Sequence, residues 1–386
     1  MRRVEIAERP DWRATAEKLG FHFHTIHGET YWDESAYYEF TLAQIERDIE
    51  APTGEIHEMA MALVEDCVRD ESLLKRLAIP QTYWDWIAQS WREASPHVYG
   101  RMDLAYDGKG SAKLYELNYD TPTSLYEAAF FQWVWLEEQK KRGALPASAD
   151  QYNLIQENLI EAFGAIAKRL PRPFYFSAVR ESVEDQATIT YLRDCAEQAG
   201  VATKNIVIED IGLSEDGRYT DLDDYVIETL FNLYPIEFMF AERFGSALPG
   251  SQVALIEPPW KAILSNKGIL PLLWQRHPGH PNLLAAAFED SPASDLPAGW
   301  VRKPFFSREG ANIEVRMPDG STEHSEGPYD DAPTIRQALH PLPHFAGGYP
   351  LIGSWVIGDR PSGIGVREDA TLITRDTSRF VPHIIV

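Results

Sequence analysis

Cysteine is scarce in this 386-residue chain, and long apolar runs are absent from it. Two cysteines, Cys67 and Cys195, exclude a disulfide framework and a cysteine-based zinc site, and they indicate a reducing environment. No segment approaches the roughly 18 uncharged apolar residues of a membrane span, and the N-terminus turns acidic at Glu5 before any signal-peptide core. We therefore expect a cytoplasmic protein that does not enter a membrane.

Basic residues are fewer than acidic ones, with 36 Lys and Arg against 59 Asp and Glu, which gives a formal net charge of -23. Wrapping a phosphate backbone requires clustered basic side chains, so we expect no nucleic-acid partner. The acidity would tolerate a cationic substrate, although many proteins are acidic only to stay soluble. What the chain does have is 44% hydrophobic and 12% aromatic residues, enough for a large core in two or three interlocked lobes.

Apolar periodicity predicts a mixed α/β fold. Two helices are expected between Asp33, as the N-cap, and Asp70, with a break at 52–54. From residue 174 onward strands and helices alternate, which predicts a partly parallel sheet covered by helices, and the last third is predicted to be strands joined by turns. The aromatic residues of a further helix predicted over 83–91 are most simply explained as part of the core. The other predicted helices are 124–141, 151–168, 183–199 and 223–233. The predicted strands are 98–106, 111–118, 174–179, 204–208, 301–305, 312–316, 334–339, 351–357 and 370–374.

The strands 98–106 and 111–118 flank a Gly-containing turn and predict a β-hairpin. Pairing Tyr106 with Ser111 sets Arg101 opposite Glu116 and Tyr99 opposite Asn118. Side chains alternate with period two, so Arg101, Asp103, Glu116 and Asn118 then share one face.

Two carboxylates and an amide oxygen on one face are ligands suited to Mg²⁺ with bound phosphates, and Arg101 could stabilise a transferring phosphoryl group. The alternative is a solvated face with an ordinary Arg101–Glu116 ion pair. The polar turn 118–124 then opens a helix, where a substrate carboxylate could bind or the segment could simply cap the helix.

Lys267 and Lys303 stand in polar surroundings within the acidic chain. The loop after Lys303 contains Arg308 and Gly310 and could fold over a triphosphate, although most such loops are only turns. The chain has no G-x-x-x-x-G-K-[ST] sequence, which excludes a P-loop. Glu184 and Asp185 begin a predicted helix and most simply favour its dipole.

These segments resemble the glutathionylspermidine synthetase-like ATP-grasp family, in particular its stand-alone members that lack an amidase domain. The resemblance runs from Arg9 to His383 and is carried by blocks in the same order: Gly100-Arg101-Met102-Asp103, 116–124, Ser265-Asn266-Lys267, Arg302-Lys303-Pro304 with Ser307-Arg308-Glu309-Gly310, and 365–369.

The resemblance implies an ATP-grasp fold with an associated preATP-grasp-like lobe, and an enzyme that activates a carboxylate with ATP for attack by an amine. It implies three interlocked parts: a helical region with the metal-binding hairpin at 1–170, the preATP-grasp-like α/β lobe at 171–260 and the nucleotide-binding lobe at 261–386. By position, the resemblance implies that the transition state is steadied by Arg101, and that Mg²⁺ is held by Asp103, Glu116 and Asn118. It implies that the ATP phosphates are contacted by Lys267 and Lys303 and the adenine ring by Gln337, Ala338 and Leu339. The peptide-like acid would be held by Thr121, Arg308 and Arg367, and the amine and peptide would lie near Glu184 and Asp185.

Two positions depart from the family. Leu233 stands where the full-length synthetase has a polar residue, and Arg379 stands where it has an acidic contact to the polyamine. An arginine there would repel a polyamine cation. The leading hypothesis is an ATP- and Mg²⁺-dependent ligase for a peptide-like acid and an amine. The alternatives are a nucleotide-binding regulatory or scaffold protein without turnover, and an acidic binding protein that takes no nucleotide.

Overall fold

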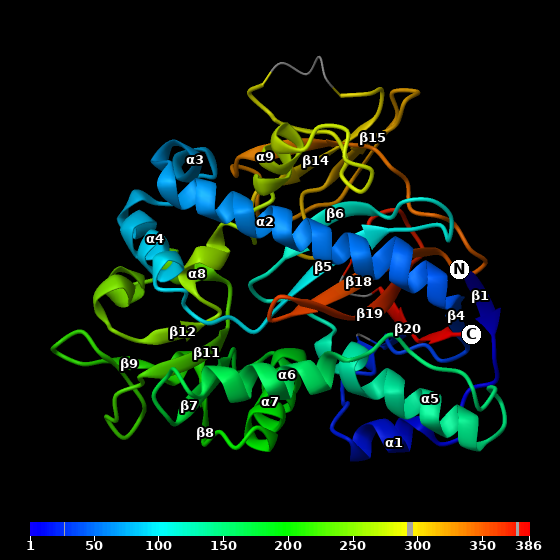
Figure 1. Cartoon of the computed structure of the whole chain (residues 1–386), viewed down its shortest axis with the longest axis horizontal. Coiled ribbons are helices and arrows are strands. Elements are labelled where there is room, and N and C mark those ends of the chain that lie inside the picture. The colour runs from blue at the N-terminus through cyan, green and yellow to red at the C-terminus, as the bar shows by residue number, and fades with distance from the viewer. Residues whose placement is uncertain (27, 292–295, 376–377) are drawn as a thin grey trace.

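The computed structural model describes residues 1–26, 28–291, 296–375 and 378–386 and has a mixed α/β fold (Figure 1). Within these residues the strands form three larger sheets and a three-stranded sheet at the chain ends, besides two short two-stranded ribbons. No helix in the described ranges has the length and apolar character to span a membrane. The mixed α/β class expected from the alternation of strands and helices is confirmed.

The central sheet joins strands from distant parts of the chain. Its order is β20-β19-β18-β5-β6, and neighbouring strands are antiparallel. Strand β5 is buried along its whole length because it is covered on both sides, which is why its sequence shows little exposed polarity. Helices α2 and α6 pack on β18 and β19. The bounds are β5 Tyr99–Ala105, β6 Lys113–Asn118, β18 Tyr349–Ile357, β19 Arg360–Asp369, β20 Arg379–Val381, α2 Ala51–Arg69 and α6 Ile155–Ile166.

A second antiparallel sheet, at the top of Figure 1, has the order β13-β17-β14-β15-β16. Helix α9 packs on β13 and β17. The bounds are β13 Ala286–Phe288, β14 Trp300–Pro304, β15 Glu314–Arg316, β16 Thr322–His324, β17 Thr334–Ala338 and α9 Ile269–Arg276.

The third sheet is parallel, in the order β12-β11-β7-β8, and α7 packs on β7 and β8. It confirms the expected parallel arrangement. The helix predicted over 223–233 is wrong, because residues 229–233 form β11, a strand buried along its length whose apolar run carries no alternation to mark it as a strand. The bounds are β7 Phe174–Ala178, α7 Val183–Gln198, β8 Thr203–Val207, β11 Thr229–Leu233 and β12 Ala254–Ile256.

The two chain ends meet in a sheet of order β1-β4-β21, in which β21 runs parallel to β4 (Figure 1). Around it and the other sheets lie the remaining elements. These are β1 Arg2–Glu5, α1 Trp12–Lys18, β2 Thr25–Ile26, β3 Glu29–Thr30, β4 Ala36–Phe40, α3 Glu71–Arg76, α4 Trp84–Arg92, α5 Gln132–Lys141, β9 Gly212–Leu213, β10 Tyr219–Thr220, α8 Ile236–Ala241 and β21 His383–Ile385, with π-helical segments Gln44–Glu50 and Glu127–Phe131 and short 3₁₀ turns Gln81–Tyr83, Ile208–Asp210, Gly245–Gly250 and Pro259–Ala262.

The segment between Asp33 and Asp70 differs from its prediction. Residues 36–40 are strand β4, and the helix that follows is not broken at 52–54. Pro52 occupies the start of α2, directly after a π-helical segment, where proline is tolerated. The strand predicted over 370–374 is also wrong, because β19 ends at Asp369.

Candidate active site

A cavity of about 370 Å³ lies where the three larger sheets meet, and every site residue predicted from the sequence lines it. The position of these residues at one cavity is thereby established, and the role assigned to each of them stays a prediction. The predicted residues on its wall are Arg101, Asp103, Glu116, Asn118, Thr121, Glu184, Asp185, Lys267, Lys303, Arg308, Gly310, Gln337, Ala338, Leu339 and Arg367.

The hairpin β5–β6 forms as predicted, but its register is shifted by two residues. Arg101 lies opposite Asn118 and Asp103 opposite Glu116, and a bulge follows Asp103. A bulge adds one unpaired residue, and turn spacing does not reveal it. Because the shift is even, the side chains predicted to share a face still do so.

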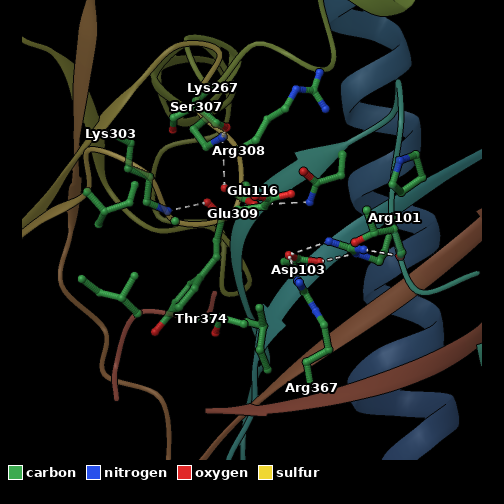
Figure 2. Close-up of a pocket in the computed structure, with 18 of the residues that line it drawn as sticks. Arg101, Asp103, Glu116, Lys267, Lys303, Ser307, Arg308, Glu309, Arg367 and Thr374 are labelled. Carbon is green, nitrogen blue, oxygen red and sulfur yellow. Dashed lines mark hydrogen bonds and ion pairs between the residues drawn. The ribbon is translucent and has the colours of Figure 1, made fainter. Parts of the chain in front are cut away.

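Asp103 is held between two arginines (Figure 2). Arg101 donates to its two carboxylate oxygens at 2.7 and 3.1 Å, and Arg367 on β19 donates to one of them at 2.8 Å. Burial alone would lower the pKa of Arg101, but Asp103 outweighs it and raises that pKa. The partner of Arg101 is therefore Asp103, and the alternative of a solvated Arg101–Glu116 pair is not the arrangement that forms.

Glu116 faces the two lysines (Figure 2). Its carboxylate lies 3.4 Å from Lys267 Nζ. Burial would raise the pKa of Glu116, but Lys267, Lys303 and Arg101 hold it down at about 2, so the group is a carboxylate at neutral pH. Lys303 donates to Gln337 Oε1 at 2.9 Å, and burial lowers its pKa to about 8. Both lysines therefore line one cavity, where their ammonium groups lie beside Glu116.

The donor set on the hairpin face fits a hard divalent cation. Asp103, Glu116 and Asn118 present carboxylate and amide oxygens, which Mg²⁺ takes together with phosphate and water. In the part of the chain that the structure describes, no group of three His, Cys, Asp or Glu side chains is arranged to hold a metal. The face thus suits a cation that takes part of its ligands from a bound substrate rather than a cage made only of protein acids.

The loop between β14 and β15 lies across the cavity and is tied down by Arg308. Its guanidinium donates to Thr121 Oγ1 at 2.6 Å and to Glu237 on α8 at 2.9 to 3.2 Å, and it lies 3.4 Å from Asp120. Gly310 has φ +72°, and a Cβ there would come within 2.9 Å of the Thr374 carbonyl oxygen. Glycine lets this loop approach the segment after β19 closely.

The predicted adenine contacts lie along and beyond β17. The amides of Ala338 and Leu339 already donate within the sheet, to carbonyl oxygens 2.7 and 3.3 Å away. The apolar wall around them is what suits a planar aromatic ring. It is lined by Leu284, Val301, Ile313, Val315, Leu339, Leu342, Leu351 and Leu372.

The opposite wall is acidic and lies at the start of α7. Ser182 caps this helix, and Glu184 and Asp185 follow in its first turn. Burial raises the pKa of Glu184 to about 8, with further contributions from neighbouring carboxylates, and burial also raises the pKa of Asp185. Both side chains line the cavity rather than facing only solvent, so the simple dipole interpretation is incomplete.

The two departures from the family pattern occupy different places. Leu233 lies in the cavity wall, but Arg379 does not. Arg379 pairs with Asp33 at 2.9 Å and with buried Glu368, which also accepts from Arg3. Arg379 therefore has two carboxylate partners and does not line this cavity, and its repulsion of a cationic substrate stays a prediction.

Sequence reasoning missed Tyr31 and Glu127. Tyr31 lines the cavity, and its hydroxyl donates to Glu127 Oε1, 2.5 Å away. Nothing in the sequence around Tyr31 marks it. Glu127 carried a signal, since it is an acid three residues after the polar turn 118–124 in an otherwise apolar helical run.

The fold and the cavity together define an ATP-grasp-type protein. A solved structure with this fold is that of a glutathione synthetase-like effector (GSS30) from Globodera pallida, with a TM-score of 0.59, 12% identity and coverage of 98% of each chain. The chain belongs to the family described as "Glutathionylspermidine synthase preATP-grasp", whose profile matches residues 3–386. The predicted fold and family are thereby confirmed.

One relative is named as an acid–amine ligase and two are named as synthetases. A Haemophilus influenzae protein named "Putative acid--amine ligase" is 38% identical over the whole of both chains. The trypanothione synthetase of Crithidia fasciculata is 30% identical over 84% of this chain and 53% of its own, and the bifunctional glutathionylspermidine synthetase/amidase of Escherichia coli strain K12 is 26% identical over 92% and 60%. This chain thus spans little more than half of those two proteins. The prediction of a glutathionylspermidine synthetase-like ligase is confirmed.

Proposed function

We propose that this chain is an ATP- and Mg²⁺-dependent carboxylate-amine ligase that acts through an acyl phosphate on a peptide-like acid and an amine. The observation that carries the proposal is that the Arg101–Asp103–Arg367 cluster and the Glu116–Lys267 pair open onto the same cavity. A carboxylate oxygen of the acid takes the γ-phosphoryl group and ADP leaves. The amine nitrogen then attacks the acyl carbon, a C–N bond forms and phosphate departs.

Each part of the cavity supports one requirement of these two reaction steps. Lys267 and Lys303 neutralise phosphate oxygens, and Arg101, fixed by Asp103, stabilises the charge of the phosphoryl group in transfer. When bound by Asp103, Glu116 and Asn118, Mg²⁺ supplies further neutralisation of phosphate charge.

The remaining charged residues suit the two organic substrates. Thr121, Arg308 and Arg367 offer donors for the carboxylate-bearing peptide. Glu184 and Asp185 offer carboxyl groups to an ammonium group, and a bound cation would favour their ionised forms. Arg308 is paired with Glu237, so an acid that binds the same edge of the guanidinium competes with that carboxylate.

The experiment is ADP release from ATP and Mg²⁺ with a panel of peptides that includes glutathione and a panel of amines that includes spermidine. Release that requires both an acid and an amine is expected. Arg101→Ala should lower it by at least about a hundredfold, since a lost charge-stabilising donor costs that much. Arg360→Ala, which removes an exposed pair with Glu161, is the control and should retain activity.

The alternative of a nucleotide-binding protein without turnover predicts that ATP raises the melting temperature while no ADP appears with any pair. One of its two motivations, the charge of Arg379, is weakened by the pairing of that residue with Asp33 and Glu368 outside the cavity lining. Leu233 remains, and it bears on which substrate fits rather than on turnover.

A further inference from the structure

Behind the cavity wall lies a hydroxyl–carboxylate pair that the steps above do not use. Tyr31 follows β3 and is buried, with its side chain at the cavity, and Glu127 opens the π-helical segment and is fully buried. The Tyr31 hydroxyl donates to Glu127 Oε1 at 2.5 Å and lies 2.9 Å from Ser124 Oγ. Ser124 adopts φ +66°, an uncommon conformation for a residue with a Cβ, in presenting that hydroxyl.

Glu127 is incompletely satisfied. Its Oε2 is buried and has no hydrogen-bond partner among the described residues. An unpaired buried carboxylate oxygen is costly, and a role in proton transfer is one explanation for such a group in a native protein. π-Helical turns, which are rare, occur frequently at functional sites.

The charged groups around Glu127 come from β5, β19 and α7, and Tyr31 adds a hydrogen bond. Burial raises its pKa to about 7, while the Tyr31 hydrogen bond, Arg101 on β5 and Arg367 on β19 oppose that rise. Glu184 on α7 is near enough to raise the pKa of Tyr31, and Glu127 in turn raises that of Glu184. Glu127 can therefore exchange a proton close to neutral pH, and the hydroxyl of Tyr31 connects it to the cavity.

We propose that Tyr31 and Glu127 take up the proton that the amine substrate must lose before it attacks. This inference rests on the proposed ligase function and concerns its second half. A proton passes from the ammonium group to Tyr31 Oη while the hydroxyl proton of Tyr31 passes to Glu127 Oε1, and the carboxylate becomes a carboxylic acid. The neutral nitrogen then forms the C–N bond, the C–O bond to phosphate breaks, and the second nitrogen proton leaves with the phosphate. Tyr31 is the group that meets the amine, and Glu127 acts through it.

The test compares two nucleophiles, with glutathione as the acid. Spermidine is an ammonium ion at pH 7 and must lose a proton, whereas hydroxylamine is already neutral and traps an acyl phosphate as a hydroxamate. Tyr31→Phe and Glu127→Gln should each lower amide formation with spermidine by about a hundredfold, the usual contribution of a positioned base, and should leave hydroxamate formation within about twofold of the wild type. Tyr126→Phe is the matched control, because its hydroxyl donates to a backbone carbonyl outside the cavity.

The pH profile provides a readout that a purely structural role would not change. Amide formation by the wild type should rise as pH increases through about 7, where Glu127 loses its proton, and then level off. Glu127→Gln should instead keep rising towards the pKa of the amine, about 10, because only the free base then reacts. Equal losses with both nucleophiles, or an unchanged pH profile in Glu127→Gln, would contradict the relay.

The outcomes separate the relay from the ligase. Hydroxamate from the wild type, together with full amide formation by Tyr31→Phe, would overturn the relay and leave the ligase proposal standing. A wild type that makes neither product with any acid and amine of the panels contradicts the ligase proposal, and the relay fails with it. Tyr31→Phe keeps the buried ring, so it remains informative if Glu127→Gln does not fold.

Discussion

At the scale of single residues, Asp103 decides the electrostatics of the candidate site. Its side chain is 2% exposed and accepts from both Arg101 and Arg367. A buried charge pair contributes little net stability against an apolar substitute, but removing one partner leaves uncompensated charge in the interior. Asp103 therefore keeps two guanidinium groups in a fixed position at the cavity.

Asp103→Asn is expected to destabilise the protein by about 3 kcal/mol, because two buried arginines then lose their common counter-charge. Urea unfolding measures the change. The control is Glu161→Gln, which breaks an exposed pair with Arg360 and should cost less than about 1 kcal/mol. Equal, small effects for the two variants would contradict the assignment of Asp103.

Lys303 predicts a pH dependence of ATP binding. Burial lowers its pKa to about 8, so the side chain is cationic below that pH and neutral above it. The attraction of Lys303 to phosphate is complete below pH 8. Above pH 8 the affinity for ATP decreases, by at most about tenfold per pH unit. Calorimetric titration with ATP and Mg²⁺ between pH 6.5 and 9.5, at roughly unit steps, measures it.

Lys303→Arg is the control for this prediction, because a guanidinium stays charged throughout that range. It should bind ATP with an affinity that no longer falls above pH 8. A wild-type affinity that does not change with pH would show that Lys303 does not meet phosphate.

At the scale of elements, the β14–β15 loop is held to α8 by the Arg308–Glu237 pair. Glu237→Ala should free the loop, and the amides of 307–312 should exchange hydrogen faster by mass spectrometry. Glu242→Ala is the matched control, because Glu242 directly follows the same helix and accepts a hydrogen bond from Tyr234 rather than from the loop. Unchanged exchange in Glu237→Ala would mean that other contacts hold the loop.

Helices and strands whose apolar residues recur with a clear period were predictable from the sequence. Fully buried or irregular elements were not. Helix α7 and strand β7 lie within a residue of their predicted bounds. Strand β11 was predicted as helix because both of its faces are buried and the alternation is absent. Strand β4 was predicted as helix because its aromatic-rich sequence, Ala36–Phe40, fits helical spacing as well.

The candidate site was predictable where its residues share a hairpin and not where they come from separate segments. The face of β5 and β6 followed from period-two alternation even though the bulge after Asp103 changed the register. Tyr31 and Glu127 meet through tertiary packing between distant parts of the chain, which local pattern does not encode. The same holds for Arg379, whose partners Asp33 and Glu368 are brought together by the fold.

At the scale of the whole molecule, the chain ends stabilise each other through β21 and β4. Ile384→Ala should lower the free energy of unfolding by about 2–5 kcal/mol, because Ile384 is fully buried and truncation leaves a cavity. Val386→Ala is the control, since Val386 is 56% exposed and should change stability by less than about 0.5 kcal/mol. Chemical denaturation of both variants measures this, and equal stabilities would contradict a structural role for the last strand.

The central sheet also has a consequence for synthesis on the ribosome. Strand β5 carries Arg101 and Asp103, yet its partner β18 and the strand that supplies Arg367 are translated near the end of the chain. A nascent polypeptide that has emerged only as far as the parallel sheet therefore exposes one edge of β5 and has an incomplete anion site. Nucleotide can assist folding only after β18 and β19 have emerged, and chains terminated before them would present an unpaired edge that favours aggregation.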